Sequence, residues 1–230
     1  MIDLHTHVLP NIDDGSKSPE ETATLLKLLQ QQGISTVVAT PHFYAIETPD
    51  AFLKRRDVSF KNMPAPAEDL PEVILGAEVA YFSGIGSCEE IIPLQLGNTR
   101  LLLIEMPFTP WTDHVIEDIC DIPVQLGLIP VLAHINRYPG KHQFPKYKDV
   151  LLERGAYFQC NAEAFLGFQS YRKAMNLLKN GYIHFLGSDA HNITTRPPQW
   201  TEARAIIEKK MGNGYWENFD REARSLFNSN

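Results

Sequence analysis

The sequence has few cysteines, and their number is odd. Cys88, Cys120 and Cys160 are the three among 230 residues, and they are widely spaced. A small disulfide-stapled domain needs several paired cysteines. We therefore expect reduced thiols and an intracellular setting.

Long apolar runs are also missing, and none approaches the length of a membrane span. The first residues, Met1 to His5, do not form the charged leader and apolar segment of a secretory signal. We expect a cytoplasmic protein that does not insert into a membrane.

Basic residues are in the minority, with 21 Lys and Arg against 28 Asp and Glu and a formal charge of −7. Nucleic acid surfaces depend on Lys and Arg clusters, so we expect no nucleic acid partner, although a local basic pocket remains compatible with this balance. We find no low-complexity tract, repeat or linker, and we expect residues 1–230 to form a single domain.

Short apolar runs rich in β-branched residues alternate with amphipathic stretches. We predict seven strands at residues 1–4, 34–40, 73–79, 101–106, 129–135, 156–161 and 184–188. The first helix is predicted from Ser18 as its cap and Pro19 at its first turn to Gly33 at its end, and further helices are predicted at residues 113–126, 147–154, 170–180 and 199–210. This order predicts an α/β fold with a parallel, closed β/α barrel, in which residues 43–70 are an insertion with a helix over 52–63.

Histidine and acidic residues fall at the carboxyl ends of these predicted strands. His5 and His7 stand two apart at the end of the first strand, so both imidazoles can face one ion. The other residues at strand ends or in the adjoining loops are Asp13, Asp14, His42, Glu78, Glu105, His134, Asp189 and His191. In a parallel barrel all of them meet at the carboxyl rim, where such folds build active sites.

Each of these residues has a simpler interpretation. A rim carboxylate can belong to a structural ion pair, and His42 after Pro41 can serve as a turn residue. Glu78 and Glu105, however, end apolar strands, where an unpaired carboxylate is costly and shared cations remove that cost. The pattern favours a metal cluster, and nitrogen and oxygen ligands without cysteine suit Mn, Fe or Zn.

Two arginines follow ligand-bearing strand ends. Arg137 and Arg196 could hold a phosphoryl group through paired N–H donors. The alternative is that each arginine pairs with a carboxylate at the rim.

An ordered set of short motifs carries a family resemblance over residues 1 to about 210. The motifs are Asp3-Leu4-His5-Thr6-His7, Asp13-Asp14-Gly15, Thr40-Pro41-His42, Gly76-Ala77-Glu78, Glu105-Met106-Pro107, Ala133-His134 through Arg137-Tyr138, Gly187-Ser188-Asp189-Ala190-His191 and Arg196-Pro197-Pro198. The chain resembles the PHP (polymerase and histidinol phosphatase) superfamily, and within it the capsule-type, manganese-dependent bacterial protein tyrosine phosphatases.

This resemblance implies a distorted seven-stranded β/α barrel with three ions, Mn²⁺ in the first place and Fe or Zn as alternatives. The first ion would be held by His5, His7 and Asp189, with Glu78 bridging to a second ion held by Glu105 and His134. A third would be held by His42, His191 and Asp14 rather than Asp13, and Arg137 and Arg196 would bind phosphate. Water activated by the ions would be the nucleophile.

The resemblance further implies a tyrosine-phosphorylated protein as partner, the tail of a bacterial tyrosine kinase in capsule or exopolysaccharide control. It also implies contacts between subunits in a homo-oligomer. A cysteine-based phosphatase mechanism is excluded, because the arginine that it needs six positions after a cysteine is replaced by Leu94, Leu126 and Leu166. The alternatives are a histidinol-phosphate-type phosphatase, a PHP exonuclease and a metal-stabilised regulatory subunit without activity.

Overall fold

A computed structural model describes residues 1–65, 69–138, 140 and 143–229. Every strand pairing in it is parallel, in two hydrogen-bonded sheets with the orders β1-β2-β4 and β3-β5-β6-β7-β8-β9. The strands are β1 (Ile2–Thr6), β2 (Thr36–Ala39), β3 (His42–Phe43), β4 (Glu72–Leu75), β5 (Glu78–Ala80), β6 (Leu101–Glu105), β7 (Ile129–Leu132), β8 (Tyr157–Asn161) and β9 (Phe185–Gly187).

The two sheets meet at both ends and form a curled parallel sheet. On one side, His7 N donates to Ala190 O and Asp189 N donates to His5 O, which joins β1 to the segment after β9. On the other side, Gly76 N donates to Ala39 O and Glu78 N to Pro41 O.

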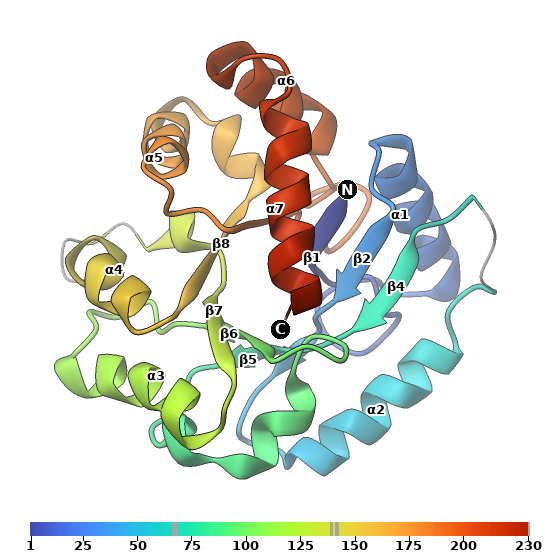
Figure 1. Cartoon of the computed structure of the whole chain (residues 1–230). Helices are drawn as coiled ribbons and strands as arrows, with labels where there is room; N and C mark the ends of the chain where they lie inside the picture. Colours follow the sequence, from blue (N-terminus) through green and yellow to red (C-terminus); the bar gives the residue numbers. More distant parts are fainter. Residues whose placement is uncertain (66–68, 139, 141–142, 230) are drawn as a thin grey trace.

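The helices are α1 (Pro19–Gln31), α2 (Pro49–Lys61), α3 (Asp113–Gln125), α4 (Phe144–Glu153), α5 (Phe168–Lys179), α6 (Trp200–Met211) and α7 (Tyr215–Ser229), with short 3₁₀ turns at Ile85–Ser87, Glu89–Leu94, Ile135–Arg137 and Ala162–Phe165. Ser18 caps α1 as predicted, because its side chain accepts a hydrogen bond from Glu21 N. Helices α1 to α6 lie around the outside of the strands, and α7 crosses the middle of the view in Figure 1.

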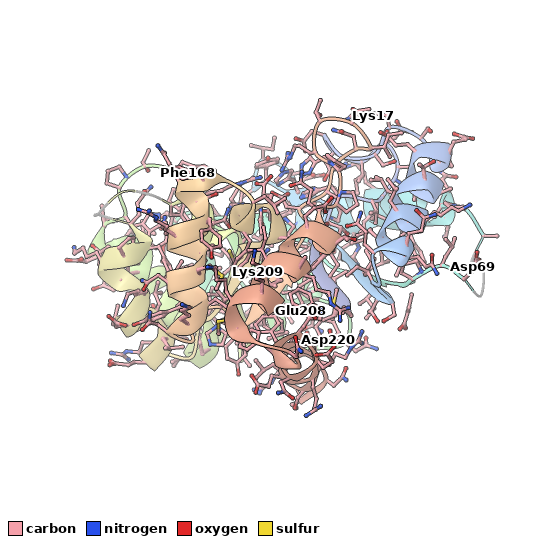
Figure 2. All side chains as sticks on the ribbon, turned by 90° about the horizontal axis from the view of Figure 1, so that it is seen from above. Lys17, Asp69, Phe168, Glu208, Lys209 and Asp220 are labelled. Carbon is pink, nitrogen blue, oxygen red and sulfur yellow. The ribbon has the colours of Figure 1, made fainter. Side chains whose placement is uncertain are left out.

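Two hydrophobic layers hold the fold together. The larger one lies between strands and outer helices. The smaller one fills the interior of the curled sheet with residues such as Leu4, Leu103 and Val131, and α7 adds Ala223 and Phe227 to it. Because α7 also contacts residues at the start of β1 and β2, through Asp220 and Arg224, it covers the amino ends of the strands. Figure 2 shows Asp220 on one side of the molecule and Lys17, from the loop after β1, on the opposite side.

The prediction of one strand over residues 73–79 was wrong in detail. Leu75 O accepts a hydrogen bond from Gly97 N, in the segment before β6. In a continuous strand this oxygen would instead pair with the adjacent strand. The chain therefore divides into β4, which pairs with β2, and β5, which pairs with β3 and β6. A side chain at Gly76 would collide with Leu96, since its Cβ would lie 2.6 Å from Leu96 Cδ2.

The region predicted as an insertion contains β3 and α2, and α2 begins at Pro49 with Thr48 as its cap rather than at residue 52. Residues 66–68 of that region lie outside the described residues. Residues 133–135 were predicted as strand and instead follow β7 as a turn, and α7 was not predicted. Among the described residues, no helix combines the length and apolarity needed to cross a bilayer.

Candidate metal centre

All nine residues that we expected to bind metal come together in one region. The expectation that Glu78 and His42 end their strands was wrong, because they are the first residues of β5 and β3. Three groups have potential ligand atoms within 4.8 Å of one another: His5, His7 and Asp189; His7, Asp14, His42 and His191; and His42, Glu78 and Glu105. His134 joins the third group, because its Nε2 lies 3.0 Å from Glu78 Oε1 and 3.2 Å from Glu105 Oε1. Neighbouring groups share residues, so the side chains form one continuous cluster.

The imidazoles of His5, at the end of β1, and of His7, just after it, face each other. Their arrangement is favourable with a cation between them. His5 Nδ1 lies 3.2 Å from Gln159 Oε1, and His7 Nδ1 lies 2.7 Å from Asp13 Oδ2. Both oxygens are acceptors, so each neutral ring carries its proton on Nδ1 and has a lone pair on Nε2. The two Nε2 atoms are only 3.2 Å apart. A positive ion between them removes the repulsion of the two lone pairs.

Glu78 lies at the centre of the cluster and is 1% exposed. Its Oε2 is 3.1 Å from His5 Nε2, 3.3 Å from His7 Nε2 and 3.1 Å from His42 Nδ1. Within the described part of the chain this oxygen has no partner in hydrogen-bond geometry, and neither has His42 Nδ1. Buried polar atoms that crowd together without hydrogen bonds fit a site for cations.

A third set of ligand atoms lies toward the solvent. His191 Nδ1 faces the backbone oxygen of Asp189 at 2.9 Å, which leaves a lone pair on Nε2, and Nε2 lies 3.3 Å from Asp14 Oδ1. Asp14 Oδ1 is also 3.6 Å from His42 Nε2. His191 Nε2 is buried and has no hydrogen-bond partner among the described residues.

The neighbouring acids Asp13 and Asp14 have different surroundings. Asp14 points into the cluster, whereas Asp13 accepts hydrogen bonds from Gly15 N, His42 N and His7 Nδ1. Burial alone would raise the pKa of Asp13, but the hydrogen bond and charge of His7 hold it well below its usual range. Asp13 therefore orients His7 as an ionised carboxylate.

Charges inside the cluster are tightly coupled. Burial would raise the pKa of Glu78, yet the His5 charge and the hydrogen bond with His134 lower it well below the usual value. Burial lowers the pKa of His134, but hydrogen bonds to Glu105 and Glu78 raise it to about 9. Protons and ions thus compete for the same nitrogen atoms.

Both arginines reach the edge of the cluster, where they pair with carboxylates. Arg137 Nη2 lies 2.7 Å from Asp189 Oδ2 and 3.3 Å from Glu163 Oε1. Arg196 Nη2 lies 2.9 Å from Asp189 Oδ1, and Nη1 lies 3.7 Å from Asp14 Oδ2. Each side chain is about one-third exposed, with 30% for Arg137 and 33% for Arg196, so both retain donors accessible from solvent.

Two exposed aromatic rings stack on histidines of the cluster. Tyr44 lies on His42 with ring centroids 5.4 Å apart, and Phe108 lies nearly parallel to His134 at 6.0 Å. They are 45% and 58% exposed. Trp111, by contrast, is buried and donates to Pro107 O, so it packs rather than facing the cleft.

The sequence analysis did not identify Gln159 and Asn161 as functional residues. Their buried side chains lie on β8 next to the cluster. A signal was present, because they are polar residues two apart in an otherwise apolar strand. Asp13 was weighed only as an alternative to Asp14, although its position six residues after His7 allowed for the contact.

The structure defines a class of protein in which a parallel α/β fold carries a buried cluster of histidines and carboxylates that could hold metal ions. Residues 1–226 match a family model described as capsular polysaccharide synthesis, CpsB/CapC. The chain belongs to this family.

Relatives in the family are similar over nearly their whole length. The chain is 30% identical to tyrosine-protein phosphatase CpsB of Streptococcus pneumoniae, over 100% of this chain and 96% of that protein. It is 32% identical to tyrosine-protein phosphatase YwqE of Bacillus subtilis, over 93% and 86% of the two chains. A solved structure from work on YwqE and CpsB, called metal-dependent tyrosine phosphatases there, superposes with a TM-score of 0.84 at 30% identity and covers 99% of this chain and 94% of that one.

Proposed function

We propose that this protein is a metal-dependent protein tyrosine phosphatase, a phosphoric monoester hydrolase. The observation that carries the proposal is the crowding of three imidazole nitrogens within 3.3 Å of Glu78 Oε2, where no hydrogen bond is formed among the described residues. Such an arrangement is unfavourable without cations. Family membership and relatives named as tyrosine phosphatases support the reaction type.

We assign three ions to the cluster, and Mn²⁺ is the preferred metal over Fe or Zn. His5, His7 and Asp189 would hold the first, and Glu78 would be shared with a second that Glu105 and His134 would complete. The third is held by Asp14, His42 and His191. The three groups of converging ligand atoms and the all-nitrogen-and-oxygen ligand set support this assignment.

When bound, such ions lower the pKa of water for attack on phosphorus and neutralise charge on the phosphoryl oxygens. The chain's own residues bind and orient the ester. Arg137 and Arg196 donate N–H groups to the phosphoryl oxygens, and because Asp189 holds both guanidinium groups, they face the same site. A phenolic leaving group, with a pKa of about 10, needs little help from a general acid.

The exposed rings of Tyr44 and Phe108 favour an aryl phosphate over an alkyl one. They border the cluster beside His42 and His134 and can contact the phenyl ring of a phosphotyrosine. The physiological partner we propose is a tyrosine-phosphorylated protein, the tail of a bacterial tyrosine kinase. The description of the family as capsular polysaccharide synthesis supports a role in capsule or exopolysaccharide control.

The setting we propose is the cytoplasm, and the three free cysteines support it. We further propose a homo-oligomer with contacts near α2, where the apolar side chains of Ile46, Val58 and Phe60 are exposed. Light scattering at assay concentrations tests this, and a monomer at every concentration contradicts it.

We also propose that residues 1–230 form one domain whose strands make a distorted seven-stranded barrel. In this description β2 with β3, and β4 with β5, each count as one bent strand. The hydrogen bonds of Gly76 and Glu78 across the bends support the count.

A substrate panel separates this function from its alternatives. Phosphotyrosyl peptide, histidinol phosphate and single-stranded DNA are offered to manganese-loaded protein. We expect the highest kcat/KM for the peptide. Preference for histidinol phosphate or DNA would replace the proposal with one of the other PHP activities, and loaded protein inert on all three would favour the regulatory subunit.

A further inference from the structure

The strand β8 contributes no candidate ligand, although both strands beside it lead to one. It lies between β7, which leads to His134, and β9, which leads to Asp189. Its residues Phe158 and Cys160 face the outer hydrophobic layer. Gln159 and Asn161 alternate with them, so they face the opposite side, and both are fully buried at 0% exposure.

The amide of Gln159 connects two ligands that belong to different ions in our assignment. Gln159 Oε1 accepts from His134 N at 2.6 Å and lies 3.2 Å from His5 Nδ1. This carbonyl oxygen requires the His5 proton on Nδ1 and leaves Nε2 free for an ion. It also fixes the backbone of His134, which has a φ of 32° in the left-handed region.

Asn161 extends the connection to a third ligand. Gln159 Nε2 donates to Asn161 Oδ1 at 3.1 Å, and Asn161 Nδ2 donates to Asp189 Oδ2 at 2.9 Å. Asp189 also has a left-handed backbone, with a φ of 52°. Backbones in this region persist only where surrounding contacts hold them.

The packing around Gln159 leaves no space for it to move toward β9. A Cβ added at Gly187 would lie 2.8 Å from Gln159 Nε2 and 2.6 Å from His5 Cβ. The glycine therefore allows β1, β8 and β9 to approach closely at the level of the cluster.

We propose that Gln159 and Asn161 are positioning residues that align His5, His134 and Asp189 as one unit for metal binding. The inference rests on the proposed metal centre. The two amides touch neither substrate nor ion. They act by fixing one imidazole tautomer, one ligand backbone and one carboxylate orientation, and so couple the first ion site to the second.

The test compares metal affinity in Gln159→Met and Asn161→Leu, which remove the amides with little change of volume. Thr99→Val is the matched control, because Thr99 is 8% exposed and its hydroxyl hydrogen-bonds Leu96 O and Leu101 N at the amino end of β6, away from the cluster. Calorimetric titration of Mn²⁺ into chelator-stripped protein gives the affinities, and elemental analysis gives the ions per chain.

We expect each amide variant to bind Mn²⁺ about tenfold to a hundredfold more weakly than the unmodified protein, while Thr99→Val binds it normally. Gln159→Glu retains an oxygen for His5 Nδ1 and His134 N but loses the donor to Asn161 Oδ1, so it should recover only part of the affinity lost in Gln159→Met. A purely structural role predicts no such recovery, because a buried charge destabilises the fold.

Two results would overturn the inference: normal affinity in both folded amide variants, or an equal loss in Thr99→Val. Failure of the proposed function has a different signature. The unmodified protein could bind manganese more tightly than the amide variants and still hydrolyse no phosphotyrosyl peptide. That result would leave the positioning role intact and remove only the proposed activity. If one of the two amide variants does not fold, the other variant alone tests the inference, because each amide contacts a different candidate ligand.

Discussion

At the scale of single residues, the cluster depends on which nitrogen of each histidine carries the proton. Asp13, Gln159 and the backbone oxygen of Asp189 each face an Nδ1 atom, of His7, His5 and His191 respectively. The three Nε2 lone pairs consequently point inward. The orientation of these candidate ligands is thus fixed by groups that we assign to no ion: the Asp13 carboxylate, the Gln159 amide and the backbone oxygen of Asp189.

Replacement of His5 by alanine should abolish turnover and leave the chain folded. The His5 Nε2 atom lies 3.1 Å from Glu78 Oε2 and 3.7 Å from Asp189 Oδ1, so its loss opens the site that we assign to the first ion. Activity on a phosphotyrosyl peptide and circular dichroism check this, with Thr99→Val as a control. Full activity of His5→Ala with manganese present would refute the assignment of this ligand.

Loss of the arginine side chains should weaken binding of the phosphoryl group. In Arg137→Ala and Arg196→Ala we expect inhibition by inorganic phosphate to need at least about tenfold more phosphate, since a charge-assisted hydrogen bond contributes about 1.5 to 3 kcal/mol. Arg221→Ala on α7, exposed and far from the strand ends that carry the cluster, is the control. Unchanged phosphate inhibition in the double variant would show that these arginines do not bind the substrate.

His184 should add a pH dependence to stability that does not involve the cluster. Burial lowers its pKa from 6.5 to about 4, and its Nδ1 accepts from Phe158 N. The unfolded chain therefore binds the extra proton between these values, and stability falls as pH decreases from 6.5 to about 4, by up to about 1.4 kcal/mol per pH unit.

His184→Asn keeps an acceptor near Phe158 N and removes the titration. Urea unfolding at several pH values should show a shallower fall for this variant in that window. Parallel curves for the two proteins would contradict the assignment.

At the scale of elements, the candidate ligands lie at one end of the curled sheet, and helix α7 covers the amino ends of the strands at the other. The positions of His5, His7 and Glu105 at or just after strand ends were recoverable from sequence, because polar residues interrupt apolar runs there. Glu78 instead begins β5. The roles of Asp13, Gln159 and Asn161 were not, since each depends on a neighbour brought close by the fold.

The sequence analysis missed the break between β4 and β5 and the helix α7. Each omission has a physical reason. The break between β4 and β5 arises from contact with the Leu96–Gly97 segment, which is remote in sequence from residues 73–79, so the strand pattern alone does not predict it. For α7 a signal existed, because Trp216, Ala223 and Phe227 recur at helical spacing, and these residues are buried.

The closing role of α7 makes a prediction of its own. Phe227 is 6% exposed and packs into the interior layer of the curled sheet. Phe227→Ala should lower the free energy of unfolding by about 3 kcal/mol and leave manganese affinity unchanged, because the cluster lies at the opposite strand ends. Arg221→Ala, on the exposed face of α7, should change neither quantity. A loss of manganese affinity in folded Phe227→Ala would mean that the two ends are coupled.

At the scale of the whole molecule, a net charge of −7 coexists with a site for an anionic substrate. In the site that we propose, divalent ions together with Arg137 and Arg196 would supply the positive charge locally. Without the ions the cluster has four carboxylates near its centre, Glu78, Glu105, Asp14 and Asp189, which would repel a phosphate ester. Metal loading therefore decides whether the protein can bind its substrate at all.

The most direct measurement is turnover of a phosphotyrosyl peptide as Mn²⁺ is titrated into chelator-stripped protein, with bound ions counted at each step. We predict no turnover without metal and a rise that follows occupancy of the cluster. Full turnover by metal-free protein, or an inert protein with its ions bound, would contradict the proposed metal-dependent phosphatase.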